Sequence, residues 1–269
     1  MRIFFDMYAG FIRKYINKPR DISLMHSELR QGYEEFRKRK HTVRFSLDNM
    51  DYIMEKHETP VFRPGDDLIA YITSNIEKHH EMDIITVAES VIAITQSRAY
   101  RLDEIRVSNW AMLLYPWVSN VTYGTGLGMA ETMQCAIEEA GLRIILQATL
   151  KGALDRIRGK HGGFYSIAGP DVKSIDFKKQ HPVEFKGSHN YIVLSPASPV
   201  SFCRIIHEKT GMRCAVVDAN NVSVDIMAVY PLNAKLKDFI YHCMRGNPAG
   251  QEDEKTPIVI LRFRGNEKQ

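Results

Sequence analysis

Cysteine is scarce in this sequence, and its spacing is unsuited to a metal site or a disulfide framework. The chain has 269 residues and four cysteines, none of them in a CxxC pair. Each stands among apolar neighbours and far from the other three, at Cys135, Cys203, Cys214 and Cys243. This pattern is typical of buried, reduced thiols in a cytoplasmic protein, and it argues against structural zinc.

Long apolar runs and an excess of one charge are also missing. No apolar run reaches the roughly 20 residues that a membrane span needs, and residues 1–18 contain Asp6 but no small-residue cleavage site, so we expect no secretory signal. The 36 Lys and Arg residues nearly balance the 32 Asp and Glu residues, leaving a formal charge of +4. Such a charge permits anionic substrates but does not indicate a nucleic-acid partner.

The composition is that of an ordinary globular protein, with 44% hydrophobic and 25% charged residues. A chain of this length can bury one large core or two modest ones. The alternation of helical and strand patterns predicts an α/β (α+β) fold, in which a mixed sheet core is flanked by helices. We expect a main domain over residues 60–264, a helical extension over 1–59 and a tail over 265–269.

The extension begins with an aromatic-rich stripe at helical spacing. Its members are Ile3, Phe4, Met7, Tyr8, Phe11, Ile12, Tyr15 and Ile16. We predict an amphipathic helix over residues 1–18 that packs on its own domain or on a dimer partner, with attachment to a membrane surface as the alternative. A second helix is predicted over 24–40, and a short polar segment through 58–60 then leads into the core.

The core begins with a helix over residues 68–79, which Asp66 and Asp67 cap after the turn at Gly65. The apolar run 84–94 predicts a buried strand. Further strands are expected at 98–106 with its turn, 164–168, 191–194, 213–218, 224–230 and 258–263, and further helices at 110–117, 129–158, 199–210 and 233–244.

Three alternate glycines, Gly124, Gly126 and Gly128, precede the helical pattern that starts at residue 129. Glycine lets backbone amides approach an anion closely, and a helix start favours negative charge, so this loop is a candidate phosphate site. The spacing is GxGxG and not that of a Walker loop. The alternative is a flexible turn before a helix.

A basic cluster follows that helical pattern, and it can hold a phosphate or carboxylate or simply complement a helix end. Its members are Lys151, Arg156, Arg158, Lys160 and His161.

Several blocks together resemble the coenzyme F-420 γ-glutamyl ligase family over roughly residues 60–264. They are GDDL at 65–68 with MDIITVAESVIAI at 82–94, VSNWA at 107–111, AGPD at 168–171, CAVVD at 214–218 and TPIVILR at 256–262. Residues 163–169 and 218–221 look closer to a bacterial branch of that family.

This resemblance implies a ligase-like fold and a ligase that depends on GTP or ATP and on Mg or Mn. Such an enzyme joins glutamate by an amide bond to an acidic acceptor through an acyl phosphate. The acceptor could be a deazaflavin coenzyme, a folate or another metabolite. A homodimer is also expected.

The resemblance matches Asp171 to a metal-binding aspartate of the ligases. Asp218 is the second candidate, because it ends an apolar strand where α/β proteins place ligands. The family's Asp-Thr pair aligns with Asp218-Ala219 after a gap or with Asn220-Asn221 without one, so Asn220 is an alternative ligand. We predict that Asp171 and Asp218 share a cation with the nucleotide's phosphates.

Two anionic partners require cations near the site, which would be Arg98, Lys151, Arg156, Lys160 and Arg262. Among these, Arg98 and Lys160 are the candidates for catalysis. Gln96 and Ser174 are further candidates for contact with the nucleotide. The ligases carry a Ser-Lys pair that contacts the nucleotide where this chain has Ala93 and Ile94, and Glu-Gly-Arg where it has residues 96–98.

These departures favour an alternative function, a binding or assembly protein that kept the fold and lost the nucleotide site. A lipid-surface protein that uses its first helix is a third hypothesis.

Overall fold

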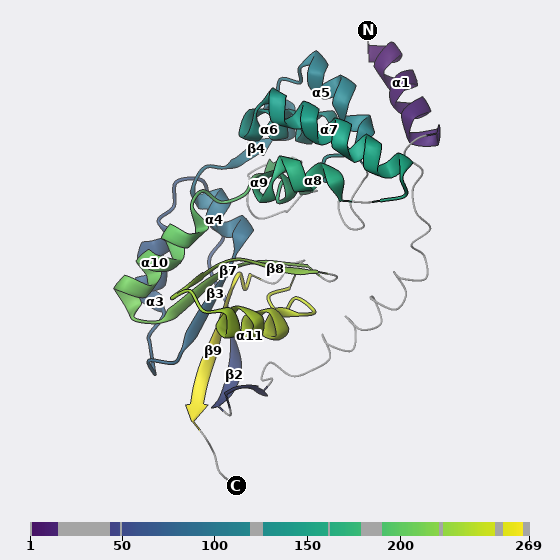
Figure 1. The fold of residues 1–269 in the computed structure, drawn as a ribbon. Helices are drawn as coiled ribbons and strands as arrows, with labels where there is room; N and C mark the ends of the chain where they lie inside the picture. The colour runs from purple at the N-terminus through teal and green to yellow at the C-terminus, as the bar shows by residue number, and fades with distance from the viewer. Residues whose placement is uncertain are drawn as a thin grey trace. The chain divides into compact units, whose positions relative to one another are not determined.

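The computed structural model describes residues 2–15, 44–48, 50–118, 126–160, 162–178, 190–220, 223–250 and 255–265. The chain divides into two compact units, each built from two stretches of sequence. Unit 1 combines Met1–Ile22 with Ser97–Ser195, and unit 2 combines Ser23–Gln96 with Pro196–Gln269. Figure 1 shows the helices and strands of both units along the chain.

The described part of unit 2 contains a mixed six-stranded sheet in the order β1-β2-β9-β3-β7-β8. β3 and β7 run parallel, and the other neighbouring pairs are antiparallel. The strands are β1 (Arg44–Leu47), β2 (Met50–His57), β3 (Ile84–Ala88), β7 (Arg213–Ala219), β8 (Val224–Tyr230) and β9 (Ile258–Gly265).

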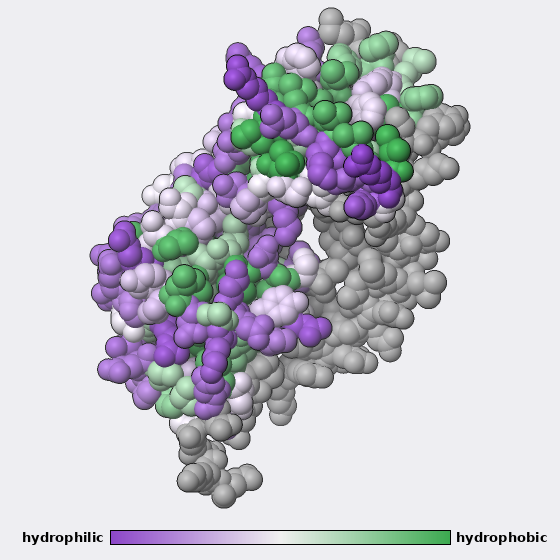
Figure 2. All heavy atoms as spheres, in the orientation of Figure 1, coloured by the Kyte–Doolittle hydropathy of each residue, from purple (hydrophilic) through white to green (hydrophobic). Residues whose placement is uncertain are grey.

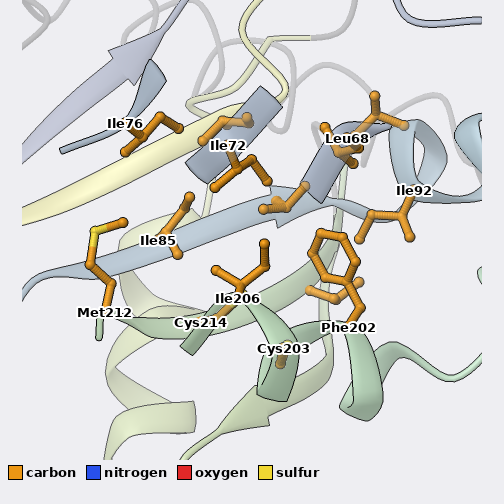
Figure 3. Packing of buried hydrophobic residues seen from close by; sticks show 14 of the residues in the cluster. Leu68, Ile72, Ile76, Ile85, Ile92, Phe202, Cys203, Ile206, Met212 and Cys214 are labelled. Atoms are coloured by element: carbon orange, nitrogen blue, oxygen red, sulfur yellow. The ribbon is translucent and has the colours of Figure 1, made fainter. Parts of the chain in front are cut away.

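Helices cover both faces of this sheet because its central strands are apolar on both sides. The helices are α3 (Leu68–Asn75), α4 (Glu89–Thr95), α10 (Pro199–Thr210) and α11 (Ala234–Met244). Successive residues of β3 serve opposite faces: Ile85 packs with Ile72 of α3 and Ile206 of α10 (Figure 3), and Ile84 belongs to the cluster that contains Ile240 of α11. The prediction of a mixed sheet core with flanking helices is confirmed.

Unit 1 is mainly helical and has a small antiparallel sheet in the order β4-β6-β5. Its strands are β4 (Ala99–Arg101), β5 (Asp176–Lys178) and β6 (Tyr191–Val193). Its helices are α1 (Arg2–Tyr15), η1 (Leu102–Glu104), α5 (Asn109–Leu114), η2 (Tyr115–Trp117), α6 (Ala130–Ala140), α7 (Leu142–Ile157), α8 (Gly163–Ala168) and α9 (Pro170–Lys173).

The predicted N-terminal helix is present as α1. It packs through buried Ala9 and Ile12, and the Tyr8 hydroxyl donates a hydrogen bond to the Leu113 carbonyl at 3.3 Å. The predicted helix over 24–40 lies outside the described residues. No described helix is both long and apolar enough to cross a membrane.

Three expectations about local structure are wrong. The run 84–94 is the strand β3 followed by the helix α4, residues 164–168 form α8 and not a strand, and the pattern over 129–158 is broken into α6 and α7. A short buried run lacks the periodicity that separates a helix from a strand. The break comes at Gly141, whose φ of 86° no helix accommodates.

Strands β1 and β2 lie within residues 1–59, where the sequence analysis predicts helices and a short polar segment but no strand. Tyr52 and Met54 alternate into the core of unit 2, and β2 pairs with β9 along its length. The neighbouring Ile53 interrupts the apolar-polar alternation in the sequence, which hides the strand.

Candidate functional site

Arg98 and Asp171 are brought together in unit 1 by a residue between them, Ser195. The Arg98 Nε donates to the Ser195 carbonyl at 2.6 Å, and the Ser195 hydroxyl donates to the Asp171 carboxylate at 3.1 Å. Ser195 is buried, whereas Asp171 is exposed. Ser195 therefore orients the Arg98 guanidinium through its backbone carbonyl and the Asp171 carboxylate through its hydroxyl group.

Glu139 at the end of α6 completes this arrangement by an ion pair with the Arg98 guanidinium. The Leu194 amide also donates to the Arg98 carbonyl at 2.9 Å, beside the pairing of β4 with β6. Arg98 is thus fixed at both its backbone and its side chain. We call Arg98, Glu139, Asp171 and Ser195 the serine-centred cluster.

Asp171 lies in the first turn of α9, directly after Pro170. A proline at the first position and an acid beside it suit a helix start, because the helix dipole favours negative charge there. Ser174 ends the same helix and its hydroxyl donates to the Pro170 carbonyl at 3.2 Å. Its role as a nucleotide contact stays a prediction.

The glycine loop is described from residue 126 onward, so Gly124 lies outside the described residues. Gly126 has a φ of 45°, and Gly126, Leu127 and Gly128 are buried. Burial raises the pKa of the nearby Tyr165 hydroxyl to about 12, against a hydrogen bond with the Leu127 backbone that lowers it. One backbone group of the loop therefore already has a partner within unit 1.

Lys160 follows α7, and its amide donates to the Asp155 carbonyl at 2.8 Å. The buried Asp155 carboxylate pairs with Lys151, and this bond together with the positive charge of Lys151 lowers the pKa of Asp155. This backbone bond connects Lys160 to Asp155 and not to the serine-centred cluster. Its catalytic role stays a prediction.

Gln96 belongs to unit 2, where its side-chain amide makes two bonds with one residue. Its Nε2 donates to the Ala197 carbonyl at 3.1 Å, and its Oε1 accepts from the Ala197 amide at 2.7 Å. These two hydrogen bonds join the Gln96 side chain to the Ala197 backbone in the way that a pair of backbone bonds joins two neighbouring strands. A nucleotide would have to replace these bonds in order to contact the Gln96 amide.

Asp218 lies near the end of β7, directly opposite Asp225 on β8. Residues in such register point to the same face of a sheet, so two carboxylates adjoin there. The Asn220 side-chain oxygen, in the following turn, accepts from the amide and the hydroxyl of Ser223 at 2.9 and 3.2 Å. These bonds use both acceptor positions of the amide oxygen, and a cation at Asn220 would have to replace them.

The donor set around Asp218 and Asp225 suits a hard cation, which takes one or two carboxylates when phosphate oxygens fill the remaining positions. Within the described ranges, no three His, Cys, Asp or Glu residues gather into a group that could hold a metal. Magnesium here would therefore need phosphate oxygens to complete its coordination. Asp171 lies in unit 1 and Asp218 in unit 2, and their sharing of one cation stays a prediction.

Ala93 and Ile94 are buried in α4, where the resembled ligases place a nucleotide-contacting pair. Both residues belong to the apolar interior of unit 2. They offer no polar side-chain group to a nucleotide.

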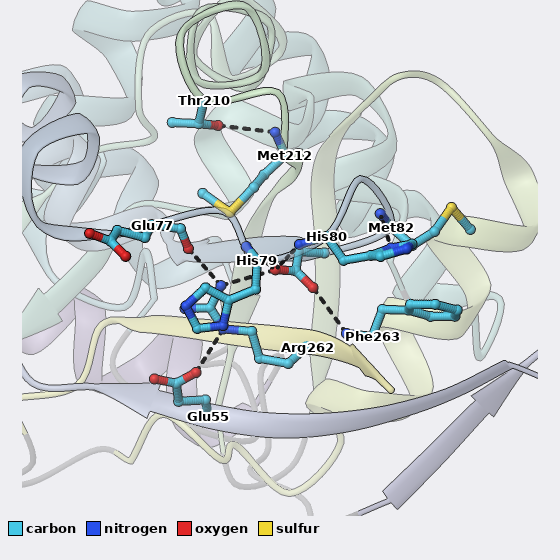
Figure 4. Close-up of polar contacts among 10 residues, drawn as sticks. Glu55, Glu77, His79, His80, Met82, Thr210, Met212, Arg262 and Phe263 are labelled. Carbon is cyan, nitrogen blue, oxygen red and sulfur yellow. Dashed lines mark hydrogen bonds and ion pairs between the residues drawn. The ribbon is translucent and has the colours of Figure 1, made fainter. Parts of the chain in front are cut away.

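Arg262, another cation that the sequence analysis expects near the site, has a structural role. Its guanidinium donates to Glu55 at 2.7 Å, to the Glu77 carbonyl at 2.7 Å and to the buried Asp83 at 3.0 Å (Figure 4). Burial opposes the charge on Arg262, but the bonds to Glu55 and Asp83 outweigh it and raise its pKa. This network joins β9 to β2 and to the turn before β3.

Sequence analysis did not identify three polar residues that lie beside the candidate site residues: Ser195, Glu139 and Asp225. Ser195 follows a predicted strand at its carboxyl end, which was the available signal. Asp225 mirrors Asp218 across the turn between two predicted strands, so counting outward from that turn would have found it. No local pattern pointed to Glu139.

Comparison with known protein families identifies the family to which the chain is similar. The model of the family described as F420-0:Gamma-glutamyl ligase matches residues 57–237, which is more than half of the chain and includes every predicted site residue. No curated protein matches the chain.

Proposed function

The chain belongs to the F420-0:gamma-glutamyl ligase family, and on this premise we propose that it joins the amino group of glutamate to a carboxylate of an acidic acceptor. The family match over residues 57–237 is the observation that carries the proposal. An acceptor of the deazaflavin type is the first to test, before a folate or another acidic metabolite. GTP or ATP drives the reaction.

The proposed reaction has two steps. An acceptor carboxylate oxygen attacks the terminal phosphorus of the nucleotide, the bond to the bridging oxygen breaks, and the nucleoside diphosphate leaves. The neutral amino group of glutamate then attacks the carbonyl carbon of the acyl phosphate, inorganic phosphate leaves, and the nitrogen loses one proton to solvent or a base and keeps the other as the amide N–H. The products are the amide, the nucleoside diphosphate and phosphate.

The serine-centred cluster supports a role for Arg98 in binding the anionic partners. Its bonds to Ser195 and Glu139 hold the guanidinium in one orientation before any substrate arrives. A cation oriented in advance stabilises developing negative charge without reorganising during the reaction. Ser195 and Glu139 act as positioning residues in this proposal.

We assign the divalent cation, Mg or Mn, to the carboxylates Asp218 and Asp225 in unit 2, with Asp171 as the candidate in unit 1. A bound cation neutralises phosphate charge and polarises the phosphoryl group. Gly126 and Gly128 would present backbone amides to an anion, and Lys160 would add a positive charge. Gln96 and Ser174 would orient the nucleotide.

A second function has support from one observation. Buried Ala93 and Ile94 offer nothing to a nucleotide where the resembled ligases use a polar pair. The alternative is a protein that kept the ligase fold and binds an acidic metabolite without turnover.

Incubation of the purified chain with the deazaflavin acceptor, glutamate, magnesium and GTP or ATP tests the proposal. The expected product is the acceptor heavier by one glutamyl residue, with nucleoside diphosphate formed in equal amount. Arg98→Gln should lower kcat/KM by at least about tenfold, the scale of one lost charge-assisted contact. Arg204→Gln, an exposed arginine on α10, is the matched control and should retain full activity.

Absence of product and of nucleotide hydrolysis with all acceptors, together with retained binding of the acceptor, would favour the non-catalytic alternative. Equal activity of Arg98→Gln and Arg204→Gln would remove Arg98 from the site while leaving the family activity intact.

A further inference from the structure

α7 carries an apolar stripe on its exposed face in addition to the face that it buries. Ile145, Ala148 and Thr149 point into the core of unit 1. The opposite side of the helix presents Leu146, Leu150, Leu154 and Ile157, spaced four, four and three residues apart. This spacing aligns the four side chains along one side of the helix. Leu150 is 63% exposed and Ile157 is 82% exposed.

Every exposed charge on this helix is positive. Arg143 and Lys151 lie on α7, and Arg158 and Lys160 follow it directly, all four exposed. The acid of the helix, Asp155, is buried and paired with Lys151. The exposed acids at the end of neighbouring α6 already have partners, since Glu138 bonds to Gln134 and Glu139 to Arg98.

α1 adds exposed apolar side chains, Phe4 and Met7, to the same unit. Both helices are tied to Trp117 of η2: its indole N–H donates to Tyr8 of α1, and its carbonyl accepts from Arg156 of α7 at 3.1 Å. Figure 2 shows hydrophobic residues gathered over the helical region of unit 1, with hydrophilic residues among them. We call the α7 stripe with its cations the cationic apolar face.

We propose that the cationic apolar face binds the surface of a membrane that contains anionic lipids. Exposed apolar patches mark interaction sites, and aliphatic side chains bordered by Lys and Arg are the pattern of helices that lie in a lipid interface. The leucines and Ile157 insert among the acyl chains near the headgroups, while Arg143 and Arg158 meet the lipid phosphates.

Charge favours this occupant over a second copy of the chain. In a twofold dimer the same patch meets itself, so the cations of one copy would enter the same contact as those of the other, and α7 has no exposed acid to separate them. An anionic surface removes that repulsion. Nucleic acid is a poorer fit, because a stripe of Leu and Ile has no partner on a phosphate backbone.

Co-sedimentation of the full chain with vesicles tests the proposal. We expect binding to vesicles of phosphatidylcholine mixed with phosphatidylglycerol, weak binding to phosphatidylcholine alone, and loss of binding as salt screens the charges. The double variant Leu150→Gln, Ile157→Gln should bind at least about tenfold more weakly, because inserted methylene groups supply the apolar part of the affinity. Arg143→Gln with Arg158→Gln should lose about fivefold per cation at the anionic surface.

Leu232→Gln is the matched control, since Leu232 is 87% exposed but lies in unit 2. It should bind vesicles as the unchanged chain does. Circular dichroism and thermal melting establish that each variant is folded. We expect all of them to fold, because the replaced side chains are exposed.

Three outcomes overturn the proposal. The chain could fail to sediment with anionic vesicles, or the Leu150 and Ile157 double variant could bind as well as the Leu232 control. Light scattering could also find a dimer that the same double variant converts to a monomer, which would assign the stripe to contact between copies. The vesicle test changes Leu150, Ile157, Arg143 and Arg158 and leaves Lys160 and the serine-centred cluster intact. These variants should therefore keep their ligase activity in the absence of vesicles, and the two proposals fail separately.

Discussion

Asp83 has no exposed surface, and four hydrogen bonds satisfy its carboxylate. It accepts from the amides of His79, His80 and Phe263 at 3.0, 3.2 and 3.0 Å, and from Arg262 at 3.0 Å. A carboxylate this deeply buried is stable only when charged donors and amides replace water. The role of Asp83 is therefore structural.

Replacing Asp83 with alanine should destabilise the protein by about 3 kcal/mol, because it leaves Arg262 and three amides partly without acceptors. Urea unfolding measures the change. Glu81→Ala, an exposed position two residues away, is the control and should stay within about 0.5 kcal/mol of the unchanged chain. Equal effects of the two substitutions would contradict the structural role.

The same carboxylate makes stability depend on pH in the acid range. Burial raises the pKa of Asp83, but the bonds from Phe263, His79, Arg262 and His80 lower it more, so its folded pKa lies below the usual value. The unfolded chain then binds the proton more readily. The contribution of the ionised Asp83 carboxylate to the free energy of unfolding is fully present above its unfolded pKa of about 3.9. It is lost as pH falls through its folded pKa.

We therefore expect the free energy of unfolding to fall more steeply below about pH 4 for the unchanged chain than for Asp83→Asn. Urea titrations at several pH values on both proteins check this. Parallel curves would show that Asp83 keeps an ordinary pKa in the folded state.

At the scale of elements, the contact between α7 and α8 depends on a glycine. A Cβ at Gly163 would lie 2.1 Å from the Asp155 Oδ2 and 2.9 Å from its Cγ. Since Asp155 is buried and paired with Lys151, its side chain could move only by giving up that pair. The glycine thus permits the start of α8 to meet the end of α7.

Gly163→Ala should lower the free energy of unfolding by about 2 kcal/mol, the usual cost of an added group in a filled site. Gly10→Ala is the control, because nothing lies within 4 Å of a Cβ at that position of α1. It should be neutral or stabilising, since alanine is the better helix former. A Gly163→Ala protein as stable as Gly10→Ala would show that α8 can shift at little cost.

At the scale of the whole molecule, nucleotide binding separates the ligase from the degenerate protein. Magnesium with GTP or ATP at about 100 times its dissociation constant should stabilise a nucleotide-binding chain by about 2.7 kcal/mol. Differential scanning calorimetry measures the accompanying rise in Tm. Asp218→Asn should remove the magnesium-dependent part of the rise while leaving the ligand-free protein at least as stable, because Asp225 then loses a like-charged neighbour.

A Tm that is indifferent to nucleotide and magnesium would support the non-catalytic alternative. A full rise in Tm of the Asp218→Asn protein with magnesium and nucleotide would instead exclude Asp218 as a metal ligand and leave Asp171 as the candidate.

The sequence by itself determined the class of fold and most of the elements with a clear period. Residues 199–210 and 224–230 were predicted with the bounds of α10 and β8, since apolar spacing and the flanking Pro, Gly and Asn residues are local signals. The succession of family blocks also identified the family. These signals need no knowledge of which distant segments meet.

Only the tertiary structure decided which residues adjoin. Ser195 lies between Arg98 and Asp171 through contacts that span 97 and 24 positions of the chain. Asp225 faces Asp218 because of strand register. The chain changes from strand β3 to helix α4 although the apolar run continues. The run does not mark this change, because a buried strand and a buried helix need the same apolar residue types. Packing between segments far apart in the chain settles such choices, and a one-dimensional pattern does not record it.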